Sequence, residues 1–216
     1  MSSDITIHHL GVSQSERVIW LMEELELPYR LIRYERDPVT RLAPLAYKAL
    51  HPMGTAPVIT DGATVLGESS AIVEFILARY GEGRLAVAPN APEFADYLYW
   101  FHFANSSLIA NEMIFLVGAG LGLGADDPGL AFARQRSDKA YDLVEARLAA
   151  SPFFAGDELT GADIMMVFAL TTMRYFMPRD FSDRPAIRAY LRRIGERPAY
   201  RRAMEKGDPG MALLLD

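Results

Sequence analysis

The sequence of 216 residues contains no cysteine. Disulfide bonds and thiolate metal sites are therefore excluded, as is any reaction in which the protein itself supplies a thiol. Histidine is scarce too, since only the adjacent pair His8-His9 and the isolated His51 and His102 are present. None of these has the spacing of metal ligands, and neighbouring side chains on a strand point to opposite faces. We expect no bound metal.

Long apolar runs are also lacking. No run approaches the roughly 20 residues needed to span a bilayer, and no basic segment followed by an apolar core opens the chain. These absences predict a soluble, cytoplasmic protein with no membrane partner.

Basic residues are outnumbered, with 22 Lys and Arg against 28 Asp and Glu and a net charge of −6. Affinity for nucleic acid comes largely from neutralising phosphates, so nucleic acid is not an expected partner. Arginines do cluster between Arg192 and Arg202, but they are spaced as on one side of a helix. We interpret them as a solvated helix face.

The most informative stretch runs from Gly54 to Tyr80. Its two β-branched and aliphatic runs flank an Asp61-Gly62 turn, which is a strong hairpin signal. Pro57 opens the first run, at a position where proline is tolerated in a sheet. A cis Ala56–Pro57 bond would leave the Ala56 backbone free to pair with an extended ligand, and a trans proline starting a strand is the alternative.

Glu68 and Ser69 precede a helical pattern formed by Ile72, Phe75 and Ile76. Ser69 is placed to be the N-cap of this helix. A helix start also binds carboxylates through its free N–H groups and positive dipole end, and Glu68 could pair with an ammonium group. The stretch therefore offers the contacts needed by an amino-acid head followed by a peptide backbone.

The chain order predicts two domains. We predict, in chain order, a strand over 4–10, a helix over 15–27, a strand over 29–34 and a short helix within 40–50. The hairpin and its helix follow, giving the order β-α-β-α-β-β-α. This α/β order resembles a thioredoxin-like domain, residues 1–81. A Gly-, Pro- and Ala-rich linker follows at 82–92. The remainder, 93–216, is predicted to be an all-α domain with helices over 94–117, 130–149, 161–177 and 185–195 and a short final helix.

With these motifs the chain resembles the cytosolic glutathione transferases of the serine type, with a bacterial, theta- or delta-like N-terminal motif. The resemblance implies that glutathione is a co-substrate and that the protein is a homodimer. It assigns glutathione binding to Thr55, Ala56, Pro57, Glu68 and Ser69. Many relatives have Lys where Thr55 stands, so Arg41 or Lys48 is a candidate replacement for contact with the glycine carboxylate.

The catalytic residues implied by the resemblance follow the first strand. A serine there donates a hydrogen bond to the glutathione sulfur, commonly with an arginine four residues on, which favours Ser13 paired with Arg17. Ser15 is the alternative, and helix capping would explain it equally well. Arg17 would either add a positive field or hold the fold through a carboxylate.

The implied reaction is attack by the glutathione thiolate on a small hydrophobic electrophile. Candidate residues for the electrophile pocket are Leu10, Tyr99 and Phe103. The alternatives are a glutathione-dependent organic hydroperoxide reductase and a non-catalytic binding module of the same fold.

One further motif is structural. Thr160 precedes an apolar helix and Asp163 lies three residues later, which is the pattern of a capping box with Asp replacing the usual Glu or Gln.

Overall fold

The computed structural model describes residues 4–124 and 126–216. These residues form two compact units. Unit 1 comprises the described residues up to Ala86 together with Gly195–Ala212, and unit 2 comprises Val87–Ile194 and Leu213–Asp216.

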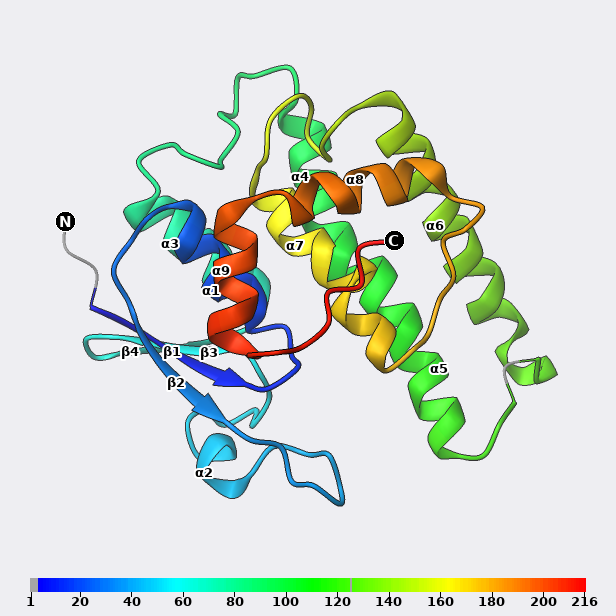
Figure 1. The fold of residues 1–216 in the computed structure, drawn as a ribbon, viewed down its shortest axis with the longest axis horizontal. Helices are drawn as coiled ribbons and strands as arrows, with labels where there is room; N and C mark the ends of the chain where they lie inside the picture. Colours follow the sequence, from blue (N-terminus) through cyan, green and yellow to red (C-terminus); the bar gives the residue numbers. More distant parts are fainter. Residues whose placement is uncertain (1–3, 125) are drawn as a thin grey trace. The chain divides into compact units, whose positions relative to one another are not determined.

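Unit 1 is built on a four-stranded sheet in the order β2-β1-β3-β4 (Figure 1). The strands are β1 (Ile5–Leu10), β2 (Arg30–Tyr34), β3 (Val58–Asp61) and β4 (Thr64–Gly67). Strand β1 runs parallel to β2 and antiparallel to β3, and β3 and β4 form the antiparallel hairpin. The predicted order β-α-β-α-β-β-α is confirmed.

Helices α1 (Glu16–Glu24) and α3 (Ser69–Tyr80) lie on one face of this sheet, and the short α2 (Leu45–Lys48) lies on the other (Figure 1). On the α2 face, Leu10, Tyr47 and Val58 form a buried cluster. Successive side chains of β1 point to opposite faces of the sheet, so His8 and His9 lie on opposite sides, as expected. The ring of His8 bonds Tyr34, whereas His9 bonds groups on the α1 side.

The last helix, α9 (Pro198–Gly207), belongs to unit 1 and packs against α1. Trp20 and Tyr200 meet edge to face with ring centroids 5.2 Å apart. Arg197 binds Glu24 in a bidentate pair, with both N–O distances 2.7 Å. The division differs from the predicted boundaries, which placed this helix with residues 93–216. Part of the predicted solvated basic face is thus paired with the acidic side of α1.

Unit 2 is helical throughout its regular structure. Its α-helices are α4 (Phe94–Phe103), α5 (Ala110–Gly120), α6 (Ala131–Ala150), α7 (Gly161–Leu170) and α8 (Pro185–Gly195). A π-helical segment, Ala104–Ile109, joins α4 to α5, so the helix predicted over 94–117 is continuous but has π-helical hydrogen bonding in its middle. Short 3₁₀ turns lie at Pro128–Leu130 and Thr172–Tyr175. Across the described residues no helix combines the length and apolarity required to cross a membrane.

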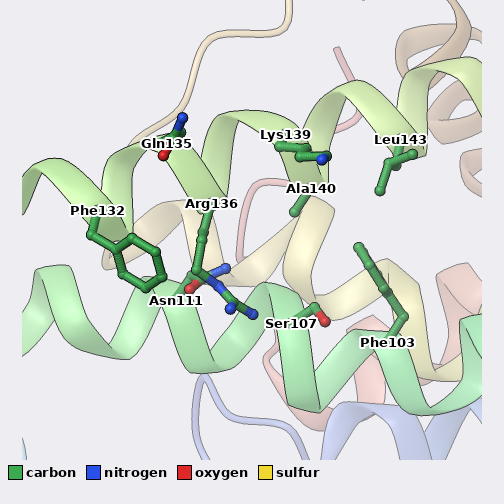
Figure 2. A pocket seen from close by; sticks show the side chains of 9 residues that line it. All are labelled: Phe103, Ser107, Asn111, Phe132, Gln135, Arg136, Lys139, Ala140 and Leu143. Carbon is green, nitrogen blue, oxygen red and sulfur yellow. The ribbon is translucent and has the colours of Figure 1, made fainter.

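A cavity of about 380 Å³ lies within unit 2, between α6 and the line of helix formed by α4, the π-helical segment and α5 (Figure 2). Phe103 and Leu143 give it apolar walls, while Arg136 and Lys139 bring cationic groups to one side. The other lining residues are Ser107, Asn111, Phe132, Gln135 and Ala140.

The predicted capping box is present at the start of α7. The hydroxyl of Thr160 accepts a hydrogen bond from the N–H of Ala162 at 3.2 Å, and the N–H of Thr160 donates to the Asp163 carboxylate at 2.8 Å. Asp163 is completely buried and also accepts from the N–H of Phe154 and the hydroxyl of Tyr190. One carboxylate therefore fixes the helix start, the preceding loop and α8.

Thr160→Ala is expected to lower the free energy of unfolding by about 1 kcal/mol, because the hydroxyl that caps α7 is lost while the backbone bond to Asp163 remains. Equilibrium urea denaturation measures this change. Thr160→Ser is the matched control, since it keeps the capping hydroxyl and is expected to retain most of the stability. Equal stability of the alanine variant and the wild type would remove the capping role.

Candidate active site

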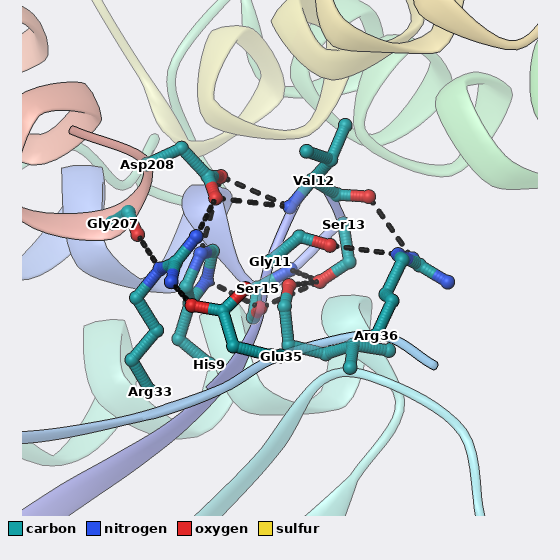
Figure 3. A network of polar contacts seen from close by, with 11 residues as sticks. His9, Gly11, Val12, Ser13, Ser15, Arg33, Glu35, Arg36, Gly207 and Asp208 are labelled. Atoms are coloured by element: carbon teal, nitrogen blue, oxygen red, sulfur yellow. Dashed lines mark hydrogen bonds and ion pairs between the residues drawn. The ribbon is translucent and has the colours of Figure 1, made fainter. Parts of the chain in front are cut away.

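The loop that follows β1 is held from several directions (Figure 3). The N–H of Gly11 donates to the carbonyl of Tyr34 at 3.0 Å, and Arg36 donates to the carbonyls of Gly11 and Val12 at 2.7 and 3.0 Å. The N–H of Val12 donates to both oxygens of Asp208 at 3.1 and 3.0 Å. Val12 has a φ of 52°, which is costly for a β-branched residue and is maintained by these bonds.

This loop presents the two candidate serines. Ser13 is 5% exposed, and its hydroxyl donates to the carbonyl of Leu10 at 2.6 Å. Ser15 is fully buried, with its Oγ 2.7 Å from that of Ser13 and 2.8 Å from Nδ1 of His9. Although Ser15 occupies the N-cap position of α1, its side chain makes no capping bond. Capping therefore does not explain Ser15.

Arg17 lies buried on α1, with 1% exposure, and connects two segments of the candidate site. Its guanidinium donates to the amide oxygen of Gln14 and, at 3.0 Å, to the hydroxyl of Ser69. Burial lowers the pKa of Arg17 to about 9, against the opposing effect of Glu16. Two of the contacts that position Arg17 are therefore made to neutral oxygens, those of Gln14 and Ser69.

The residues predicted to bind glutathione lie along the hairpin and the start of α3. The Ala56–Pro57 bond is cis, and β3 begins immediately afterwards at Val58. Thr55 is exposed and Ala56 is half-buried. The two residues named as alternatives to a lysine at position 55, Arg41 and Lys48, are also exposed.

Glu68 and Ser69 differ in their surroundings. Glu68 is exposed at the N-cap of α3 with a φ of 66°. Ser69 is 2% exposed and is the first residue of the helix, so the prediction that it is the N-cap is wrong. Its hydroxyl instead accepts from Arg17 and donates to Gln14 at 3.2 Å. Because the buried guanidinium of Arg17 lies within hydrogen-bonding distance, the Ser69 side chain bonds Arg17 and does not cap the helix.

The residues predicted for an electrophile pocket belong to different units. Leu10 is buried in unit 1. In unit 2, Tyr99 is 50% exposed and Phe103 is 7% exposed, with ring centroids 5.3 Å apart on α4. Phe103 lines the cavity of Figure 2, whose lining does not include Tyr99.

Sequence reasoning missed the contact between His9 and Asp208. Nε2 of His9 lies 3.2 Å from the Asp208 carboxylate, near the other end of the chain. Asp208 belongs to no motif, and only the turn-forming residues around it signal the end of a helix. Among the described residues no group of three or more His, Cys, Asp and Glu side chains is arranged to hold a metal ion.

Comparisons with known proteins define the family. A model of the glutathione S-transferase N-terminal domain matches residues 13–79, and one of the C-terminal domain matches residues 127–193. Glutathione S-transferase 3 of Schizosaccharomyces pombe is 31% identical over 220 residues, covering 94% of this chain and 87% of the relative.

Solved structures agree. A glutathione S-transferase from Actinobacillus pleuropneumoniae is 34% identical with a TM-score of 0.86, covering 98% of this chain and 94% of that one. A theta class enzyme from Xanthomonas axonopodis pv. citri, solved with glutathione bound, is 26% identical with a TM-score of 0.72 and coverage of 99% and 100%. The chain belongs to the glutathione S-transferase family and is an enzyme of that family, with the thioredoxin-like and all-helical parts expected from the sequence.

Proposed function

We propose that this enzyme binds glutathione in unit 1, stabilises its thiolate with the hydroxyl of Ser13, and transfers it to small hydrophobic electrophiles. The observation that carries the proposal is the position of Arg17. It connects Gln14, beside Ser13, with Ser69 at the start of α3. Arg17 thereby links the loop of Ser13, proposed to contact the sulfur of glutathione, with Ser69, proposed to contact its γ-glutamyl end. The relative solved with glutathione bound supports the choice of ligand.

A stabilised thiolate answers a specific chemical need. A free thiol has a pKa near 8.5, so only a few per cent is ionised at neutral pH. A hydrogen bond to a charged group contributes roughly 1.5–3 kcal/mol, and each pKa unit corresponds to 1.36 kcal/mol. One serine hydroxyl would therefore lower the thiol pKa by about one to two units. Because the chain has no cysteine, glutathione must supply the thiol.

The surroundings of the two serines support Ser13 as the donor. Both serines are buried, but Ser13 is 5% exposed while Ser15 is fully enclosed between Ser13 and His9. The hydroxyl of Ser13 currently donates to the carbonyl of Leu10. Rotation about one side-chain bond would transfer that hydrogen bond to a sulfur arriving beside the loop.

We propose that Thr55, Ala56 and Pro57 contact the peptide part of glutathione and that Glu68 and Ser69 hold its γ-glutamyl end. The exposed carboxylate of Glu68 suits an α-ammonium group, and the first N–H groups of α3 suit the neighbouring carboxylate. Ser69 is oriented for this role by Arg17.

Glu68→Gln is expected to weaken glutathione binding on the order of tenfold with little change in kcat, because it removes the charge proposed to pair with the ammonium group. Isothermal titration with glutathione measures the Kd. Glu74→Gln, also exposed on α3, is the matched control and should bind normally. Unchanged affinity of the Glu68 variant would contradict the assignment.

For the electrophile we propose contacts with Leu10, Tyr99 and Phe103. Phe103 and the apolar walls of the cavity in unit 2 support a hydrophobic class of substrate. We also propose that the enzyme is a homodimer. The exposed apolar side chains of Met113, Ile114 and Val117, spaced along α5, support an interface on that helix.

A further inference from the structure

A continuous line of polar contacts links four side chains of unit 1, Asp208, His9, Ser15 and Ser13, in that order (Figure 3). They come from the turn after α9, from β1 and from the entrance to α1. Each is no more than 5% exposed. Their successive distances are 3.2, 2.8 and 2.7 Å. The line ends at the hydroxyl proposed to act on glutathione.

Asp208 is fixed as the acceptor at the other end. Its oxygens accept from the N–H of Val12, and Arg33 donates to it at 3.2 Å. Burial by itself would raise the pKa of Asp208, but the bonds from His9, Val12 and Arg33 lower it below its ordinary value. A carboxylate facing Nε2 requires that this nitrogen carry a proton.

The close approach depends on Gly207. A Cβ there would lie 3.3 Å from Nε2 of His9 and 3.0 Å from Cδ1 of Ile19. The absence of a side chain lets the end of α9 pass close enough to His9 for Asp208 to reach it.

Counting protons leaves two arrangements for the rest of the line. If Nδ1 of His9 is unprotonated, it accepts the only hydroxyl proton of Ser15. Ser13 must then donate to Ser15, so that its proton points inward. If Nδ1 carries a proton as well as Nε2, the ring of His9 is an imidazolium cation paired with Asp208. His9 then donates to Ser15, Ser15 donates to Ser13, and the proton of Ser13 is directed away from the line.

The second arrangement fits the contacts of Ser13. Its hydroxyl donates to the carbonyl of Leu10 at 2.6 Å, and a carbonyl oxygen can only accept. The 2.7 Å contact with Ser15 must then be carried by the proton of Ser15. Besides the protonated His9, the charged side chains of the described residues that contact the line or the adjoining loop include Asp208, Arg33, Arg36 and, through Gln14, Arg17.

We propose that His9, held by Asp208, is a positioning residue that acts through Ser15 to direct the Ser13 proton toward the thiolate of glutathione. Hydrogen bonds aligned head to tail polarise one another, so the last donor is strengthened. No proton leaves the line, and no covalent bond changes within it. This inference rests on the proposed role of Ser13.

The test is the thiol pKa of glutathione bound to the full-length enzyme, measured from its ultraviolet difference spectrum as pH is varied. Ser15→Ala is expected to raise this pKa by roughly half a unit, about a threefold change in the thiolate equilibrium. The Kd for glutathione should stay unchanged, and kcat should fall about threefold. Ser182→Ala, in an exposed turn of unit 2, is the control and should show no shift.

His9 variants separate positioning from simple support of the fold. His9→Asn keeps a polar group near the position of Nδ1, facing Ser15, and should retain most of the pKa lowering. His9→Gln keeps a polar group near the position of Nε2, facing Asp208, and should lose most of the lowering of the thiol pKa. If Ser15→Ala does not fold, this pair decides the question. Equal thiol pKa values in the two variants would overturn the relay.

Ser13→Ala in the same assay separates the two proposals. A raised pKa in Ser13→Ala together with a wild-type pKa in Ser15→Ala overturns only the relay. A wild-type pKa in Ser13→Ala overturns the role of Ser13 itself.

Discussion

Ser13→Ala is expected to lower kcat about tenfold or more while changing the affinity for glutathione little. The hydroxyl is proposed to stabilise the reacting thiolate, which contributes roughly 1.5–3 kcal/mol, and not to provide general binding. A loss in kcat and in kcat/KM of similar size is the kinetic pattern of such an interaction. Steady-state kinetics with glutathione and a chlorinated aromatic electrophile measure it.

Ser182→Ala serves as the control, because this exposed serine bonds only the neighbouring turn through Asp180 in the contacts described. A Ser13→Ala enzyme with wild-type kcat would contradict the assignment. A larger loss in Ser15→Ala than in Ser13→Ala would show that the wrong serine was chosen.

Asp163→Ala is expected to lower the free energy of unfolding by about 3 kcal/mol or more. The carboxylate is completely buried, and its removal leaves the N–H groups of Phe154 and Thr160 without their acceptor. Each buried donor that loses its partner costs about 1–3 kcal/mol. Urea denaturation should therefore give a much larger effect than for Thr160→Ala.

The same carboxyl has a defined pH dependence. Burial raises the pKa of Asp163 from 3.8 to about 6, although the bonds from Phe154, Thr160 and Tyr190 oppose the rise. The native state thus holds the proton more tightly than the unfolded chain. The stability that this group contributes is fully present below pH 3.8 and is lost as the pH rises through about 6.

The difference in unfolding free energy between wild type and Asp163→Ala should accordingly be larger at pH 5 than at pH 7.5. Asp157→Ala, in the exposed part of the same loop, is the control and should change stability little at either pH. A difference that grows with pH would contradict the direction of the shift.

Local patterns predicted much of the fold. The Asp61-Gly62 turn between two aliphatic runs specified the hairpin, and Thr160 with Asp163 specified the start of α7. Both depend on residues within a few positions of one another. The packing of α9 on α1 instead brings together residues that are far apart in the chain, such as Arg197 and Glu24. The spacing of the arginines in the sequence predicted a polar helix face, but it did not predict that this face pairs with α1.

The candidate site shows the same limit. The sequence identified Ser13, Arg17 and Ser69 as candidates, but it did not predict the hydrogen bond from Arg17 to Ser69. With that bond, Ser69 lies inside α3 and Glu68 takes the N-cap position. Likewise the adjacent pair His8-His9 was set aside because it cannot bind one metal. The pairing of His9 with Asp208 required the fold to bring the end of α9 to β1.

The central claim is that this enzyme holds glutathione as a thiolate at neutral pH through Ser13. The most direct test is the ultraviolet difference spectrum of glutathione bound to the wild-type enzyme across a pH range, with Ser13→Ala measured in parallel. We predict a bound thiol pKa lowered by about one to two units in the wild type and returned toward its ordinary value in the variant. Binding with an ordinary thiol pKa in the wild-type enzyme would contradict the account.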